Sequence, residues 1–129
     1  MYIDPKAAYL QTRATSSVHD ASPHKLISLL FDACQESLAV AKGGIERKEI
    51  KTKANAIKKA MDIIVRLQAC LDFERGGDVA ERLDNLYTIC TNKLALGNAT
   101  NDATQIDDVF RIIAELKLGW AQIEGTPVE

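Results

Sequence analysis

The chain has 129 residues, a length that fits one domain (1–129) and can bury an apolar core without disulfides or metal ions. The composition is 47% hydrophobic but only 5% aromatic, with seven Gly and three Pro, and this disfavours β-architectures, which need many turns. The formal net charge of −2 supplies no positive field for a phosphate backbone, so we expect no nucleic-acid partner.

The first 21 residues are expected to form a short cap helix and a mobile N-terminal arm. Apolar residues between Tyr2 and Leu10 follow a short helical pattern, and the polar run after them has no period. The N-terminus lacks a basic region followed by an apolar run, and no apolar segment approaches about 18 residues. We therefore expect a cytoplasmic protein without direct membrane insertion.

Two amphipathic helices are predicted next, at 22–44 and 47–73. Ser22 and Pro23 are a strong start signal, because Ser accepts backbone N–H bonds at the N-cap and Pro suits the first helical position. Gly43 and Gly44 are expected to end the first helix. Apolar residues recur at helical spacing in both segments. They are Leu26, Ile27, Leu30, Cys34, Leu38, Ala41 and Ile45, then Ile50, Ala54, Ile57, Ala60, Met61, Ile64, Leu67 and Leu71.

A double glycine organises the second half of the chain. Gly76 and Gly77 can adopt a positive φ and are expected to reverse the chain, which places Asp78 near the positive end of the next helix. That helix is predicted at 77–97, closed by Gly97 and Asn98, and the last helix at 102–124. Their apolar stripes are Val79, Leu83, Leu86, Cys90 and Leu94, then Ile106, Val109, Phe110, Ile113, Leu116, Trp120 and Ile123.

These four segments predict an all-α fold. Each has about 20 to 25 residues, and the short breaks between them make sequential neighbours antiparallel. The predicted architecture is an up-down-up-down four-helix bundle, with the N-terminal cap and arm laid over one surface.

No pattern in the chain indicates a catalytic, metal or cofactor site. His24 lies in the first turn of a helix and lacks the Glu-x-x-His context of a di-metal bundle site. It is also badly placed for phosphotransfer, and we expect it to be an exposed residue of the capping region. Cys34, Cys70 and Cys90 have no C-x-x-C spacing and fit buried small hydrophobes. We expect no enzyme activity and no cofactor.

The segment after Gly44 is locally basic, with a net charge of +4 from six basic and two acidic residues. A solvated helix face is the favoured interpretation, and contact with an acidic partner is the alternative. The residues are Arg47, Lys48, Lys51, Lys53, Lys58 and Lys59, with Glu46 and Glu49.

The helices carry apolar residues on their shoulders beyond the core stripes. This surplus needs a partner, either inside the fold or on another polypeptide, and it favours a binding module whose inter-helix grooves accept segments of another chain. Self-association into a homodimer is the alternative. The shoulder residues are Leu29, Phe31, Val40, Ile63, Val65, Ile89 and Leu96.

Two separated motifs resemble a known family. Thr15 to Asp32 contains Ala-Ser-Pro, then Lys-Leu-Ile and Leu-Phe-Asp, and Leu71 to Tyr87 contains Leu-Asp, Gly-Gly and Leu-Tyr. In this order they resemble the flagellar secretion chaperone family, FliS, over essentially the whole chain. Phe31 stands where that family commonly has Tyr.

The resemblance implies an export chaperone that binds the disordered C-terminal segment of flagellin, prevents premature polymerisation and delivers the cargo to an export-gate membrane protein of the flagellar type III apparatus. It also implies that residues around Tyr2 to Leu10 occupy part of the groove without cargo, and Tyr9 matches the family's N-terminal Tyr. From the helical patterns we expect Ile89 and Leu96, beside Lys93, to face the cargo, while Tyr87 fits either face. The candidate contacts are Tyr9, Ile27, Leu30, Phe31, Leu86, Tyr87, Ile89, Lys93 and Leu96.

Overall fold

The computed structural model describes residues 23–124, and this part of the chain consists of four α-helices. Helix α3 spans Pro23–Glu46, α4 spans Ile50–Ala69, α5 spans Phe73–Thr100 and α6 spans Ala103–Glu124. Only residues 47–49, 70–72 and 101–102 connect them. The predicted N-terminal cap and arm, with Tyr9, lie outside the described residues.

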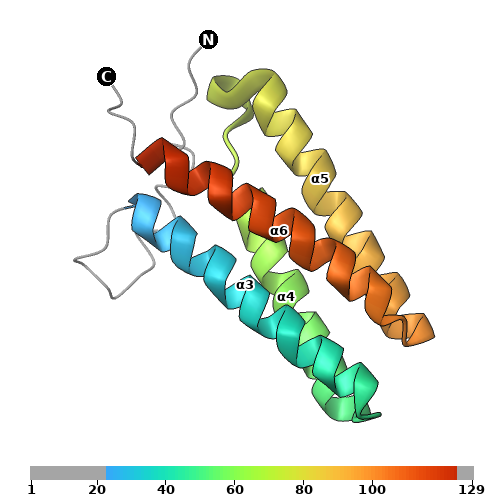
Figure 1. Ribbon diagram of the computed structural model, residues 1–129. Coiled ribbons are helices and arrows are strands. Elements are labelled where there is room, and N and C mark those ends of the chain that lie inside the picture. The colour runs from blue at the N-terminus through green and yellow to red at the C-terminus, as the bar shows by residue number, and fades with distance from the viewer. Residues whose placement is uncertain (1–22, 125–129) are drawn as a thin grey trace.

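The helices run up, down, up and down in one bundle (Figure 1). Helices α4 and α6 each pack against both α3 and α5, so α3 and α5 stand at opposite corners. This arrangement confirms the predicted antiparallel four-helix bundle. Two ion pairs also join α3 to α6, Lys42 with Asp107 and Asp32 with Lys117. Such exposed pairs contribute less than about 1 kcal/mol each, so apolar burial supplies most of the stability.

The core takes most of its residues from the predicted stripes of the four helices. It also includes Phe31 and Ile63, which the sequence predicts as shoulder residues, whereas Ile50, Val79 and Phe110 of the predicted stripes are exposed. Burying one large aliphatic side chain stabilises the fold by about 1.5–3 kcal/mol, and the bundle buries many. The core residues are Ile27, Phe31, Cys34, Leu38, Ala41, Ala56, Ile57, Ala60, Ile63, Ile64, Leu67, Tyr87, Cys90, Leu94, Ile106, Val109, Ile113 and Trp120.

The first double glycine does not end α3, so that prediction is wrong. The helix continues to Glu46 and closes with two bonds, from Lys48 N to Ile45 O (3.2 Å) and from Glu49 N to Gly44 O (2.8 Å). Lys48 supplies the left-handed residue of this closure, with φ 60°. Gly44 serves close packing instead, because an added Cβ there would lie 2.8 Å from Lys53 N of α4.

The second double glycine is not the site of chain reversal, which corrects a further prediction. The chain turns at residues 70–72, and the Asp72 carboxylate accepts the Arg75 N–H at 3.1 Å as the N-cap of α5. This cap starts the helix at Phe73, three residues before Gly76. Gly77 alone departs from helical geometry, with φ 52° and ψ −128°, and it places a kink inside α5.

The α5–α6 connection is a tight corner. Helix α5 extends past Gly97 to Thr100 and ends on Asn101 in the left-handed conformation, with Asp102 N bonded to Gly97 O at 3.0 Å. The Asp102 carboxylate then accepts the Thr104 N–H at 3.0 Å and caps α6. These hydrogen bonds to Thr104 hold the pKa of Asp102 below its ordinary value.

Candidate functional site

One ion pair marks the side of α5 that faces α6. Lys93 Nζ lies 3.2 Å from Asp108 Oδ2. Leu86 and Val79 precede Lys93 by about two and four helical turns and therefore share its face. On α6, Ile112 follows Asp108 by one turn and faces α5 in the same way.

The two helices separate along this side. Near their connection they are in close contact, since an added Cβ at Gly97 would lie 3.1 Å from Gln105 Cβ. Toward the other end the ribbons of α5 and α6 diverge (Figure 1). Val79 is 44% exposed there, although its stripe predicts a core position. The prediction fails for Val79 because the buried side of α5 at this level is that of its neighbour Ala80, which is 3% exposed.

We call this surface the α5–α6 face. Leu83, Ile112 and Leu116 are half-buried and pack against the core on one side, whereas Val79 is 44% exposed, so the face is a partly exposed edge of the core. Surfaces of this kind on small proteins commonly bind other polypeptides. The face consists of Val79, Leu83 and Leu86 on α5, with Ile112, Leu116 and Gly119 on α6.

Several predicted contact residues lie on or beside this face. Leu86 belongs to it, and Lys93 closes it through its ion pair with α6. Ile89 and Leu96 are 45% and 49% exposed and flank Lys93 on the same helix. Leu30, on α3, is half-buried and packs against the core.

Three other predicted contact residues are core residues in this structure. Ile27, Phe31 and Tyr87 are at most 3% exposed. Tyr87, for which the sequence leaves both faces open, belongs to the core cluster. Tyr9 lies outside the described residues.

Gly119 lies on this face but is not among the predicted cargo contacts. Its position as a glycine inside a helix is visible in the sequence. A glycine in the interior of a helix lowers stability relative to Ala and usually has a packing or functional reason. Here an added Cβ would meet no heavy atom of the described structure within 4 Å. Packing within residues 23–124 therefore does not require a glycine at this position.

His24 is buried, at 2% exposed, which contradicts the expected exposed position. Its Nε2–H donates to the Trp120 carbonyl at 2.7 Å, and the Trp120 indole N–H donates to the His24 carbonyl at 3.0 Å. Burial occurs because the end of α6 covers the first turn of α3. His24 is thus a structural residue that joins two helix ends.

Cys34 and Cys90 are fully buried, as predicted, while Cys70 is half-buried. Burial, with the neighbouring thiol as a second cause, raises the pKa of Cys34 to about 12. Burial raises the pKa of Cys90 to about 11, and Lys93 partly offsets this. Both side chains therefore remain neutral thiols at physiological pH, where nucleophilic chemistry needs a thiolate.

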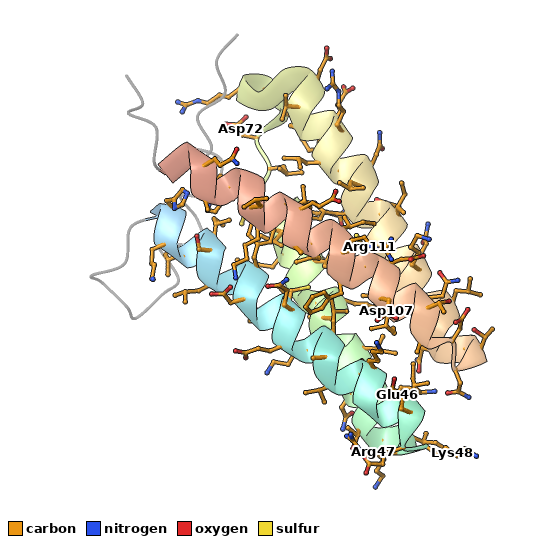
Figure 2. The ribbon with its side chains drawn as sticks, in the orientation of Figure 1. Glu46, Arg47, Lys48, Asp72, Asp107 and Arg111 are labelled. Atoms are coloured by element: carbon orange, nitrogen blue, oxygen red, sulfur yellow. The ribbon has the colours of Figure 1, made fainter. Side chains whose placement is uncertain are left out.

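The basic segment divides between structural and solvated residues. Glu46, Arg47 and Lys48 lie at the end of the bundle where α3 passes to α4, and Asp72 lies at the opposite end (Figure 2). Lys53 is only 7% exposed, and its ammonium donates to Asn98 O at 3.0 Å and Asn101 Oδ1 at 2.6 Å. The remaining lysines are exposed.

Two kinds of feature are absent from residues 23–124. No group of three or more His, Cys, Asp and Glu side chains is placed to hold a metal ion. No helix in this range is both long enough and apolar enough to cross a bilayer.

Comparison with known proteins assigns the chain to a family. The family described as flagellar protein FliS matches residues 5–127. The chain belongs to the FliS family. This confirms the resemblance that its motifs carry, and the match includes every residue of the α5–α6 face.

Named relatives are similar over most of their length. The flagellar secretion chaperone FliS of Vibrio cholerae is 39% identical over 116 residues, which cover 90% of this chain and 85% of the relative. FliSB of Pseudomonas aeruginosa is 42% identical over 112 residues, with 87% and 89% covered. FliS of Salmonella typhimurium is 38% identical over 117 residues, with 90% and 87% covered. The family is one of chaperones rather than enzymes.

Proposed function

We propose that this protein is a cytoplasmic export chaperone that binds the C-terminal segment of flagellin and keeps it from polymerising before export. Family membership supports the chaperone role, since the relatives are named flagellar secretion chaperones. We choose the α5–α6 face as the binding surface because Val79, a residue of the apolar stripe of α5, is 44% exposed. A cargo helix laid along the α5–α6 face would cover it.

The mechanism is masking, without bond chemistry. A disordered cargo segment gains helix when its apolar residues, spaced i, i+3, i+4 and i+7, pack against an apolar surface. Ordering the cargo costs about 2–5 kcal/mol or more, so a long contact is needed to offset it. The masked segment is then unable to assemble with other flagellin subunits.

The proposed contact residues differ in whether the bundle must rearrange before they can touch cargo. Leu86, Ile89 and Leu96 are accessible on α5 and can meet cargo without rearrangement. Ile27, Phe31 and Tyr87 would touch cargo only after the bundle opens, since they are buried in this structure. We extend the proposal to residues around Tyr2 to Leu10, including Tyr9, which would compete with cargo for the same face.

Delivery is the second half of the proposed role. The chaperone–cargo complex, rather than the chaperone alone, would meet an export-gate membrane protein of the flagellar type III apparatus. This order ensures that only a loaded chaperone is received at the gate.

Binding can be tested with a matched pair of valines. The chain should co-elute with a C-terminal flagellin peptide at micromolar concentration, and the peptide should gain helix by circular dichroism. Val79→Asp should abolish the complex, whereas Val65→Asp, on a valine of α4 that is 53% exposed, should leave it intact. Absence of any complex with the unmodified chain, or equal effects of both substitutions, would sink the proposal.

Self-association is the second candidate, favoured by the exposed Ile89 and Leu96 on one side of α5. In a homodimer these residues would pair across a two-fold axis. Light scattering should then show a dimer that persists on dilution, and Ile89→Ser should convert it to a monomer. Loss of the dimer on adding cargo would show that both partners use the same surface.

A further inference from the structure

A cavity of about 400 Å³ lies where the α3–α4 connection meets the α5–α6 corner. We call it the end cavity, since Lys48, one of its lining residues, stands at this end of the bundle (Figure 2). Its walls come from the end of α3, the start of α4 and the corner after α5, so it is separate from the α5–α6 face. The lining residues are Gly44, Ile45, Lys48, Ile50, Lys53 and Asn101.

Lys53 brings a buried positive charge to the wall of the end cavity. Its side chain donates from Nζ to Asn98 O at 3.0 Å and to Asn101 Oδ1 at 2.6 Å, and both acceptors are neutral. An ammonium has three N–H donors, so one remains. A buried lysine is normally paired with a negative charge, and the C-terminal end of the α5 dipole supplies only about half of one. Part of the charge of Lys53 is therefore uncompensated.

Three acidic residues lie close to the lining residues in sequence, and none of them supplies the missing charge. Asp102 Oδ1 accepts from Thr104 N at 3.0 Å and caps α6. Glu49 Oε1 pairs with Arg47 Nε at 3.3 Å. Glu46 is exposed, and within residues 23–124 it forms no ion pair with either lysine of the cavity. The end cavity therefore favours an anionic ligand.

The remaining lining residues indicate what the anion is attached to. Lys48 adds a second cation, held by its left-handed backbone with φ 60°. Ile50 is 73% exposed, more than any other large apolar residue of the described chain, and Ile45 is half-buried beside the core. Cations next to apolar side chains suit a carboxylate carried by an aliphatic residue. The last residue of a polypeptide has both features, because its α-carboxylate adjoins its own side chain.

The proposed cargo brings such a chain end within reach. It is a C-terminal segment and therefore ends in a free α-carboxylate. The α5–α6 face is closed at Lys93, and Asn101 follows eight residues later, about 12 Å along the helix axis. About four extended residues cover that distance.

From this geometry we propose that the end cavity binds the C-terminal residue of the cargo segment. Its α-carboxylate meets the ammonium groups of Lys53 and Lys48, and its side chain lies against Ile45 and Ile50. The inference rests on the proposed flagellin binding. It adds a specificity determinant, since an anchored chain end fixes the direction of the cargo, parallel to α5, and excludes segments from the interior of a chain.

The cavity is tested first with a small probe, N-acetylleucine, and its amide. The acid should shift the NMR signals of the Asn101 side-chain amide and the Asp102 backbone amide saturably at millimolar concentration. N-acetylleucine amide has the same side chain without the charge, so it should bind about tenfold more weakly or not at all. Equal shifts from acid and amide would overturn the proposal.

Lys48→Asn tests the charge without disturbing the fold, because Asn readily adopts the left-handed conformation of this position. It should weaken binding of N-acetylleucine by about threefold or more at low salt, with an unchanged melting temperature. Lys51→Gln is the matched control, since it removes one charge from an exposed position of α4 that does not line the cavity. Its affinity should equal that of the unmodified chain, and equal losses in both variants would contradict a defined site.

The cargo is tested with a labelled flagellin C-terminal peptide, made once as the free acid and once as the C-terminal amide. Fluorescence anisotropy should show about tenfold weaker binding of the amide. Equal affinities of the two peptides would overturn the inference and leave the proposed function standing. If neither peptide binds, the proposed function fails and the inference fails with it.

Discussion

The imidazole of His24 and the indole of Trp120 stack in parallel where α3 begins and α6 ends, with ring centroids 4.5 Å apart and planes inclined by 7°. Each residue also donates its ring N–H to the main-chain carbonyl of the other, at 2.7 and 3.0 Å. The pair therefore joins two residues 96 positions apart in sequence through three contacts. The His24–Trp120 pair holds the start of α3 against the end of α6.

Trp120→Phe should lower the free energy of unfolding by about 1–3 kcal/mol, because the His24 carbonyl stays buried without the indole donor. Urea unfolding followed by circular dichroism measures this. Phe110→Leu is the control, since Phe110 is 38% exposed on the same helix and its change should stay within about 0.5 kcal/mol. Equal urea midpoints for the two variants would contradict a stabilising role for the His24–Trp120 pair.

Gly44 and Gly119 should respond in opposite directions to the same substitution. Gly44→Ala forces α3 away from the α4 backbone and should destabilise the bundle by about 1–3 kcal/mol, as overpacking does. Gly119→Ala should stabilise it by about 0.5–1 kcal/mol, because the site is open and Ala is the better helix former. Thermal melting of both variants checks the signs, and a stabilised Gly44→Ala would refute the close approach.

The sequence predicted the number, order and main faces of the helices, because apolar periodicity depends on burial along each helix. It misplaced the ends where two local signals compete. The cap at Asp72 determines the start of α5, and the pair Gly76 and Gly77 produces only a kink. At the other end, Lys48 adopts the left-handed conformation that glycine usually takes.

The sequence predicted the candidate surface less well than the fold. Periodicity shows which face of a helix is apolar, but it does not show how neighbouring helices pack against that face. Val79 has the spacing of a core residue, yet it is exposed while its neighbour Ala80 is buried. His24 looks like a capping residue, yet Trp120, nearly a hundred residues later, covers it. Both outcomes depend on tertiary contacts that local patterns do not encode.

The stability of the fold should decline at alkaline pH through its two buried thiols. In the folded chain the pKa of Cys34 is about 12 and that of Cys90 about 11, against an ordinary value of 9.0. Above pH 9 the unfolded chain loses these protons first, so the free energy of unfolding falls as pH rises toward the folded values. Urea midpoints of the unmodified chain and Cys34→Ala should approach each other between pH 9 and pH 11, and a constant gap would contradict this.

Lys53 should prove to be a structural residue rather than part of a solvated basic face. Its ammonium, from α4, bonds Asn98 O in the last turn of α5 and Asn101 Oδ1 in the corner that follows. A cation at this position also complements the negative end of the α5 dipole. Lys53→Met keeps the aliphatic stem but leaves both part-buried acceptors without this donor, and it should cost about 1–3 kcal/mol.

Lys58 provides the matched control for Lys53. It lies on the same helix, where its exposed side chain forms an i,i+4 ion pair with Asp62 at 3.0 Å. Lys58→Met removes a pair of the kind that contributes about 0.3–0.5 kcal/mol, so its unfolding midpoint should barely move. Hydrogen exchange adds a local test, because loss of Lys53 frees the α5–α6 corner and should speed exchange at Asp102 N–H, which bonds to Gly97 O. If both variants unfold alike and that amide stays protected, the corner is held by its own turn bonds, and the burial of Lys53 is incidental to it.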